Sequence, residues 1–137
     1  MKSKQCLDVQ QMQHLQELGL DTNNASMCWL KTPNGRDLTF NDECINNDEW
    51  INLDESLLDP VPAYTLQDVL DALPEYIYDS TEQYILEINM FFKYIRYSRF
   101  NDVLTKRNFN RTPIIDAAYE LLCWAIENKF VETNKNE

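Results

Sequence analysis

The sequence predicts an α+β fold in which a small antiparallel sheet, made of a meander and a hairpin, is packed by about three helices. Three segments carry helix-capping signals and helical apolar spacing, and short apolar runs bounded by turn residues lie between them. The chain has 137 residues, of which 44% are hydrophobic, so it is long enough to bury one core. We therefore expect a single domain over 1–137, with its core in 7–131 and a frayed tail at 132–137.

The first predicted helix lies within 7–20, "LDVQQMQHLQELGL". Asp8 is placed to cap its first turn, with Gln11 three residues later to complete a capping box. Gly19 supplies the left-handed residue that ends the helix. At about 100° per residue, one apolar stripe is formed by Val9, Met12, Leu15 and Leu18.

Three short strands are predicted after this helix. The segments 25–32, 36–40 and 49–53 are short apolar runs, and the first ends at the turn "PNG" at 33–35. Together these strands would form the meander of the small antiparallel sheet.

The second predicted helix lies within 64–74, "YTLQDVLDALP". Thr65 caps it, Asp68 completes the capping box, and Pro74 ends it. The apolar face consists of Leu66, Val69, Leu70 and Leu73. Because Asp68 and Asp71 fall on the opposite face, we interpret them as solvated carboxylates rather than an acid–base pair.

The segment 84–98 fits two patterns. Its apolar residues follow a helical repeat, but they also alternate, and β-branched and aromatic residues are frequent. We favour a hairpin with its turn near Asn89 and Met90, although no glycine is present to tighten that turn. The helix stays open as the alternative.

The last predicted helix, 112–128, should be the centre of the core. Thr112 is placed to cap it, with Pro113 at its first position. Its narrow polar stripe consists of Asp116, Glu120 and Glu127. Cys123 and Trp124 lie at opposite edges of that stripe, about 100° apart. We interpret Cys123 as an inert residue at the edge of the core and Trp124 as partly exposed surface.

The residue inventory argues against several chemistries. Two glycines leave no glycine-rich phosphate loop, and His14, the sole histidine, leaves no multi-histidine metal site. The acidic segment "NDECINNDE" lacks the calcium-loop frame and its turn glycine. We expect no enzyme, no cofactor and no metal, while a dyad of His14 with an unspecified cysteine stays open.

The expected compartment is the cytoplasm, with no membrane contact, because the chain has neither a spanning apolar run nor the pattern of a signal peptide. The cysteines would then be reduced and unpaired, and no two of them form a C-x-x-C pair. They are Cys6, Cys28, Cys44 and Cys123.

Charge is divided unevenly along a chain whose net charge is −11. The stretch 37–92 has no base, whereas 93–111 has six bases and one acid. These stretches either neutralise one another within the fold or form a dipolar surface that selects a charged partner. The candidate interaction surface consists of Asp42, Glu43, Asp48, Glu49, Asp54, Glu55 and Trp124.

Aromatic and basic residues alternate in 91–100, "FFKYIRYSRF". This is typical of segments that grip single-stranded nucleic acid. On strand geometry, however, Tyr94 and Arg96 take one face and Arg99 the other, so the cations are divided between the two faces. Nucleic-acid binding through 91–111 is therefore only a weak alternative.

Three stretches, 14–29, 64–74 and 113–128, together resemble a group of small proteins encoded by gut Bacteroidales and by their phages and mobile elements. The resemblance implies a cytoplasmic accessory protein of a mobile element with an α+β fold, and it favours the hairpin at 84–98. The group has no established activity, so the resemblance assigns no site residue.

The leading functional hypothesis is a non-catalytic protein-interaction module. The alternative is an acidic mimic of nucleic acid that blocks a host DNA- or RNA-binding protein through the base-free stretch 37–92. An ordinary apolar interface should tolerate salt, whereas a mimic should bind a basic partner with steep salt dependence. Neither the partner nor homo-oligomerisation is specified by the sequence.

Overall fold

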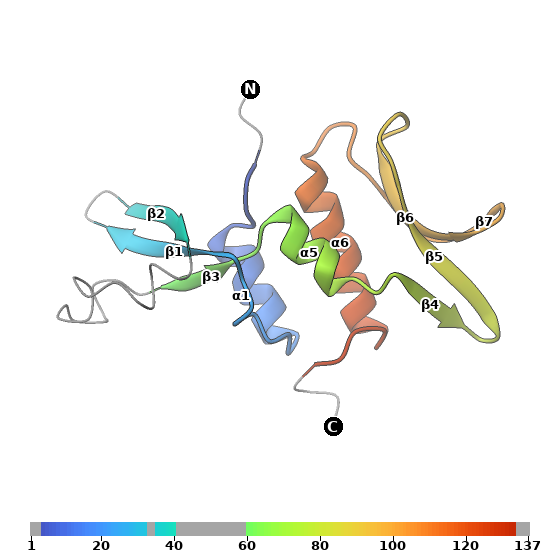
Figure 1. The fold of residues 1–137 in the computed structure, drawn as a ribbon, viewed down its shortest axis with the longest axis horizontal. Helices are drawn as coiled ribbons and strands as arrows, with labels where there is room; N and C mark the ends of the chain where they lie inside the picture. Colours follow the sequence, from blue (N-terminus) through green and yellow to red (C-terminus); the bar gives the residue numbers. More distant parts are fainter. Residues whose placement is uncertain (1–3, 33–34, 41–59, 134–137) are drawn as a thin grey trace.

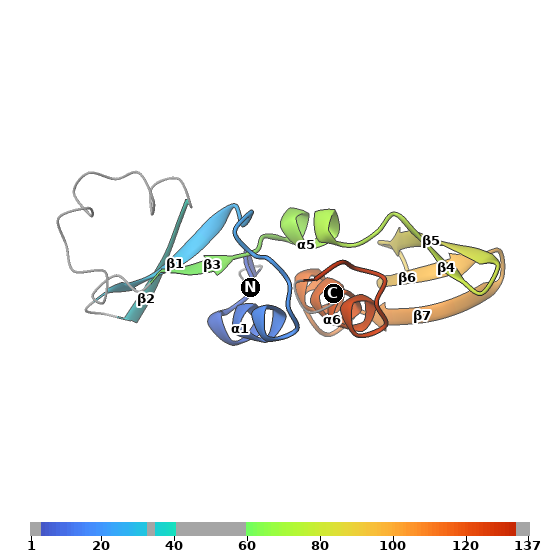
Figure 2. The same ribbon diagram turned by 90° about the horizontal axis from the view of Figure 1, so that it is seen from below.

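The computed structural model describes residues 4–32, 35–40 and 60–133. It confirms the predicted α+β fold: this part of the chain forms three helices and two antiparallel sheets, of three and four strands. The helices are α1 (Val9–Glu17), α5 (Leu66–Ala72) and α6 (Ile114–Glu127). The two sheets lie at opposite ends of an elongated molecule, with the helices between them (Figures 1 and 2).

The three-stranded sheet has β1 (Met27–Thr32) at its centre, between β2 (Gly35–Phe40) and β3 (Val61–Ala63). Its first two strands confirm the strands predicted at 25–32 and 36–40. Both neighbours pair with β1 in antiparallel fashion.

The third strand of this sheet was not predicted. The predicted strand 49–53 lies outside the described residues, as do residues 33 and 34 of the predicted turn. The observed third strand, β3, has three residues and includes Pro62, which pairs with Cys28. Proline lacks a backbone donor, so it is tolerated here because β3 is an edge strand.

The four-stranded sheet is a meander with the order β4-β5-β6-β7. Its central hairpin, β5–β6, confirms the hairpin predicted at 84–98 and rules out the helical alternative. The outer strands, β4 and β7, were not predicted. The strands are β4 (Tyr76–Asp79), β5 (Glu82–Asn89), β6 (Tyr94–Arg99) and β7 (Asp102–Asn108).

The β5–β6 turn forms without glycine because one side chain stabilises it. The Asn89 Oδ1 atom accepts hydrogen bonds from the backbone N–H groups of Phe91 (3.0 Å) and Phe92 (2.8 Å). Lys93 takes the left-handed conformation, with φ of 59°. Its carbonyl oxygen accepts a hydrogen bond from the Phe109 N–H group at 2.8 Å, which ties the turn to the end of β7.

Helix α6 is the predicted centre of the core. Seven of its residues are buried, and it contacts α5 on one side and strands β6 and β7 on the other. Its predicted cap is wrong: Pro113, not Thr112, is the N-cap residue, and no side chain caps the helix. Pro113 has an extended ψ of 146°, so the helix begins one residue later and the Thr112 side chain is too far back to cap it.

The capping boxes predicted for α1 and α5 are both present, at Asp8/Gln11 and Thr65/Asp68. Asp68, however, is not the freely solvated carboxylate that was expected. It also accepts hydrogen bonds from the Ser26 N–H (2.9 Å) and the Ser26 hydroxyl (2.7 Å). The second helix is thereby joined to the residue that precedes β1.

The expectation that every cysteine is unpaired is wrong for Cys28, which is disulfide-bonded. Cys6 and Cys123 are free thiols, and Cys44 lies outside the described residues. The expectation was drawn from a presumed reducing compartment. Such reasoning carries no information about which sulfur atoms the fold brings within bonding distance.

Native Cys6 and Cys123 should react slowly with a thiol reagent at neutral pH. Burial raises the pKa of each thiol to about 11, and the thiolate is the reactive form. A shift of two pKa units lowers the thiolate fraction about 100-fold at neutral pH. Labelling followed by mass spectrometry should therefore accelerate as the pH rises and on unfolding in denaturant. Rapid labelling of Cys123 in the native protein only would instead identify a reactive site.

Candidate interaction surface

The acidic residues of the sequence-predicted surface lie outside the described residues: Asp42, Glu43, Asp48, Glu49, Asp54 and Glu55. Its remaining member, Trp124, is half-buried on α6. The Trp124 ring lies against Tyr97 and Phe130, with ring centroids 6.1 Å and 5.4 Å away. Trp124 therefore packs at the margin of the core, where it offers little free surface.

Exposed apolar side chains gather instead on the four-stranded sheet. Among the described residues, every exposed large hydrophobic side chain belongs to this sheet or its turns. They are Tyr76, Tyr78, Ile85, Ile88, Met90, Phe91, Phe92, Phe100 and Val103. Scattered exposed apolar residues are normal on protein surfaces, but their concentration on one sheet makes that sheet a candidate interaction site.

Strand register explains the exposure of Tyr76, Tyr78 and Ile85. The exposed residues 90–92 and 100 lie in turns, and Ile88 lies opposite Ile95 on the inner face. Neighbouring residues of a strand point to opposite faces, so Ile95 and Tyr97 lie on the inner face, where both are fully buried. The Tyr97 hydroxyl also donates a hydrogen bond to the Pro74 carbonyl oxygen at 2.7 Å, which fixes β6 beside the end of α5. The opposite, outer face has no helix over it in Figures 1 and 2. By cross-strand pairing this outer face holds Tyr76, Tyr78, Ile85, Glu87, Tyr94, Arg96 and Lys106.

Cations and one aromatic ring form a cluster on the outer face. Arg96 and Lys106 are paired across β6 and β7, and both lie over the ring of Tyr94, at 4.4 Å and 5.7 Å from its centroid. Arg96 Nε also contacts Glu87 Oε1 at 2.5 Å. Tyr94 and Arg96 thus share a face, as the strand periodicity predicts.

Among the described residues, two ion pairs join the acidic stretch to the basic stretch, as the neutralising interpretation expects. They are Glu87–Arg96 and Glu82–Arg99. A third basic residue, Arg107, lies 3.9 Å from Glu120 of α6, which belongs to neither stretch.

The β5–β6 turn carries what we call the aromatic tip, defined as Met90, Phe91 and Phe92. The exposed fractions of Phe91 and Phe92 are 85% and 68%. Their rings pack edge to face, with centroids 4.9 Å apart. Because Asn89 fixes the backbone of this turn, both rings are presented on an ordered support.

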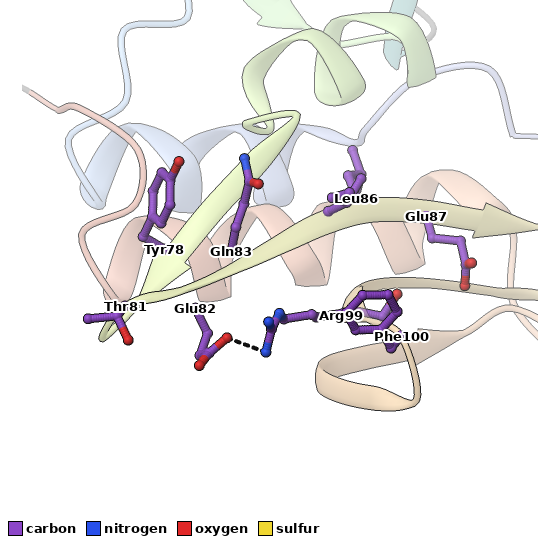
Figure 3. A pocket seen from close by; sticks show the side chains of 10 residues that line it. Tyr78, Thr81, Glu82, Gln83, Leu86, Glu87, Arg99 and Phe100 are labelled. Atoms are coloured by element: carbon purple, nitrogen blue, oxygen red, sulfur yellow. Dashed lines mark ion pairs between the residues drawn. The ribbon is translucent and has the colours of Figure 1, made fainter.

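A groove of about 810 Å³, which we call the terminal groove, lies at the other end of the same sheet. Pairing between β5 and β6 ends at Ile85–Ser98, whereas β4–β5 and β6–β7 pairing continues beyond it. The two outer hairpins therefore separate, and the groove lies between them. Its apolar lining residues are Tyr78, Ile85, Leu86 and Phe100. Glu82 of one hairpin is ion-paired with Arg99 of the other (Figure 3).

In the described part of the chain, His14 and the acidic side chains do not gather into a catalytic cluster. No cluster of three or more His, Cys, Asp or Glu side chains there could hold a metal ion. The His14 ring lies edge-on to Tyr119, with its Nδ1 atom 4.0 Å from a Glu17 carboxylate oxygen. Nor is any helix in residues 4–32, 35–40 and 60–133 both long and apolar enough to cross a membrane.

The sequence contained a signal for the aromatic tip that was not used. Turns are normally polar, yet "MFF" occupies the position predicted as the turn of a hairpin. The interpretation of the sequence instead places Phe91 and Phe92 in a helical repeat and in the aromatic and basic stretch 91–100, and Met90 at the predicted turn. Three large apolar residues at a predicted turn should have indicated a contact surface.

Comparison with known proteins gives no further assignment. No protein-family model matches the chain, and neither a curated protein nor a solved structure shows significant similarity to it.

Proposed function

We propose that this chain is a non-catalytic protein-binding module whose partner contacts the outer face of the four-stranded sheet and the aromatic tip. The observation that supports the proposal is the exposure of Phe91 and Phe92 on an ordered turn. Full burial of a phenylalanine side chain is worth roughly 1.5–3 kcal/mol, so a partner that covers both rings gains considerable affinity. Large aromatic anchors of this kind are typical hot spots of protein interfaces.

The accessory role in a phage or mobile element is part of this proposal and is supported by the sequence resemblance alone. The acidic-mimic alternative stays a prediction, because the acidic residues named for its surface lie outside the described part of the chain. A second candidate function is the binding of single-stranded nucleic acid. It is favoured by Tyr94, which offers a stacking surface between Arg96 and Lys106.

Site-specific photo-crosslinking in the native host tests the proposal. With a photoreactive phenylalanine analogue at Phe92, we expect a discrete protein adduct that still forms at high salt, because an apolar contact is little screened. The same analogue at Gln13, exposed on α1, should give none and is the matched control. Replacing Phe91 by Ser should weaken capture at least about tenfold, since each 1.4 kcal/mol changes affinity tenfold.

Other outcomes would contradict the proposal in distinguishable ways. An adduct removed by nuclease would establish the nucleic-acid candidate. An adduct that forms only at low salt, on a strongly basic protein, would favour the mimic. Equal adducts from Phe92 and Gln13 would mean that the aromatic tip is ordinary surface.

A further inference from the structure

The aromatic tip and the terminal groove lie at opposite ends of the same sheet. The tip is the β5–β6 turn, whereas the groove lies between the β4–β5 and β6–β7 turns. Strand β5 joins the two and, at about 3.3 Å per residue, holds them roughly 20 Å apart. A tip therefore cannot reach the groove of its own chain.

The apolar part of the groove wall matches the tip in polarity, although six of the ten lining residues are polar or charged. The tip is a pair of packed phenyl rings that projects from a tight turn. The groove has a volume of about 810 Å³, which is within the usual range for sites that enclose apolar groups. Its walls include Tyr78 and Ile85 from one hairpin and Phe100 from the other, all of them exposed in the single chain. Insertion of the rings would cover apolar surface on both sides.

The charges beside the two features are also complementary. Lys93 directly follows the tip; its side chain is exposed and has no ion pair with any residue in the described part of the chain. Glu82 and Glu87 both line the groove. Arg99 lines it as well, so acids outnumber bases in the groove by two to one. Both glutamates are ion-paired, Glu82 with Arg99 and Glu87 with Arg96, so a lysine that accompanies the inserted rings would share a carboxylate with an arginine.

We propose that copies of this chain associate head to tail, with the aromatic tip of one copy inserted into the terminal groove of the next. This inference rests on the proposed function, because it names a second copy of the chain as the partner of the same surface. The contact is heterologous, so the assembly grows beyond a dimer unless it closes into a ring.

Two complementary variants test this arrangement. The tip variant carries Phe91→Ser and Phe92→Ser and keeps its groove. The groove variant carries Ile85→Arg and Phe100→Asn and keeps its tip. All four side chains are exposed, and asparagine tolerates the φ of 51° at Phe100, so both variants should fold, as circular dichroism can verify.

Sedimentation and light scattering give the readout. The average mass of the wild-type protein should rise with concentration, while each variant alone stays monomeric. An equimolar mixture should form a one-to-one dimer and stop there, because only one tip and one groove remain intact. Gln13→Arg, the charge-matched control for Ile85→Arg, should associate like the wild type.

A wild-type protein that stays monomeric at all concentrations would overturn the inference, and so would a mixture that forms no dimer. Association that survives in the groove variant but not in the tip variant would indicate a tip-to-tip contact and would equally overturn it. If the wild type is monomeric but Phe92 still crosslinks to a different protein, this inference fails and the proposed function stands. If Phe92 gives no adduct and the wild type is monomeric, both fail.

Discussion

Replacing Leu122 by alanine is expected to lower the free energy of unfolding by about 2–5 kcal/mol. Leu122 is fully buried in α6, the helix that packs against both α5 and the four-stranded sheet. The substitution removes three heavy atoms from a site with no access to solvent. The loss therefore combines the transfer free energy of those atoms with the cost of the cavity they leave.

Denaturant unfolding followed by circular dichroism measures this loss, with Glu120→Ala as the matched control. Glu120 is two residues away on the same helix, is exposed, and makes only a long ion pair with Arg107 at 3.9 Å. Its replacement should change stability by no more than about 0.5 kcal/mol. Equal losses at Leu122 and Glu120 would show that the assignment of the buried face is wrong.

Asp116 is a poor control, although the sequence places it on the same polar stripe as Glu120. Its Oδ1 atom accepts hydrogen bonds from Lys4 Nζ at 2.7 Å and from Gln11 Nε2 at 3.0 Å. It thereby joins the N-terminal segment and α1 to α6. Helical periodicity identifies which face is polar, but it carries no information about which distant donors pack against that face.

Local signals were sufficient to place the three helices, whereas for the segment 84–98 they left a helix open beside the hairpin. Each capping box links residues three positions apart, so Asp8/Gln11 and Thr65/Asp68 could be identified without tertiary information. The same holds for the apolar spacing that placed α6 in the core.

The missed strands lack such signals. β3 has three residues, one of them Pro62, and pairs only because β1 is beside it. In β7 the pairing with β6 shifts at Tyr97/Ser98, which breaks the alternation on which strand prediction depends. β4 has four residues and begins at Tyr76, two positions after Pro74. The partner of β3 is distant in sequence and the register of β7 is irregular, whereas β4 pairs regularly with the adjacent β5 but is short.

The sequence and the structure point to different candidate surfaces. The acidic residues chosen from net charge lie outside the described residues, so that part of the prediction stays a prediction. Net charge drew attention to 37–92, and a single exposed-looking residue, Trp124, was added from its helix angle. The outer face depends on which side of the sheet α6 covers, and this is a tertiary property. The terminal groove depends on where the pairing between β5 and β6 stops, which no local pattern records.

Replacing Asp68 by alanine is expected to lower the free energy of unfolding by about 1–3 kcal/mol, whereas Asp71→Ala should change it by no more than about 0.5 kcal/mol. The sequence places both carboxylates on one solvated face of the second helix, but the structure separates them. Asp71 is exposed, and its only described partner is Gln67, at 2.7 Å. Asp68 accepts hydrogen bonds from the Thr65 N–H and from both donors of Ser26.

The loss at Asp68 has two parts that further variants can separate. Alanine removes the N3 half of the capping box and leaves the Thr65 and Ser26 N–H groups without this acceptor. Ser26→Ala removes only the hydroxyl contact, so it should cost less than Asp68→Ala. The loss of stability in the double variant should be smaller than the sum of the two single losses, because both substitutions remove the same hydrogen bond. Thermal unfolding of all four proteins measures this coupling. Strict additivity, or equal effects of Asp68→Ala and Asp71→Ala, would mean that in solution Asp68 is the solvated carboxylate that the sequence alone suggests.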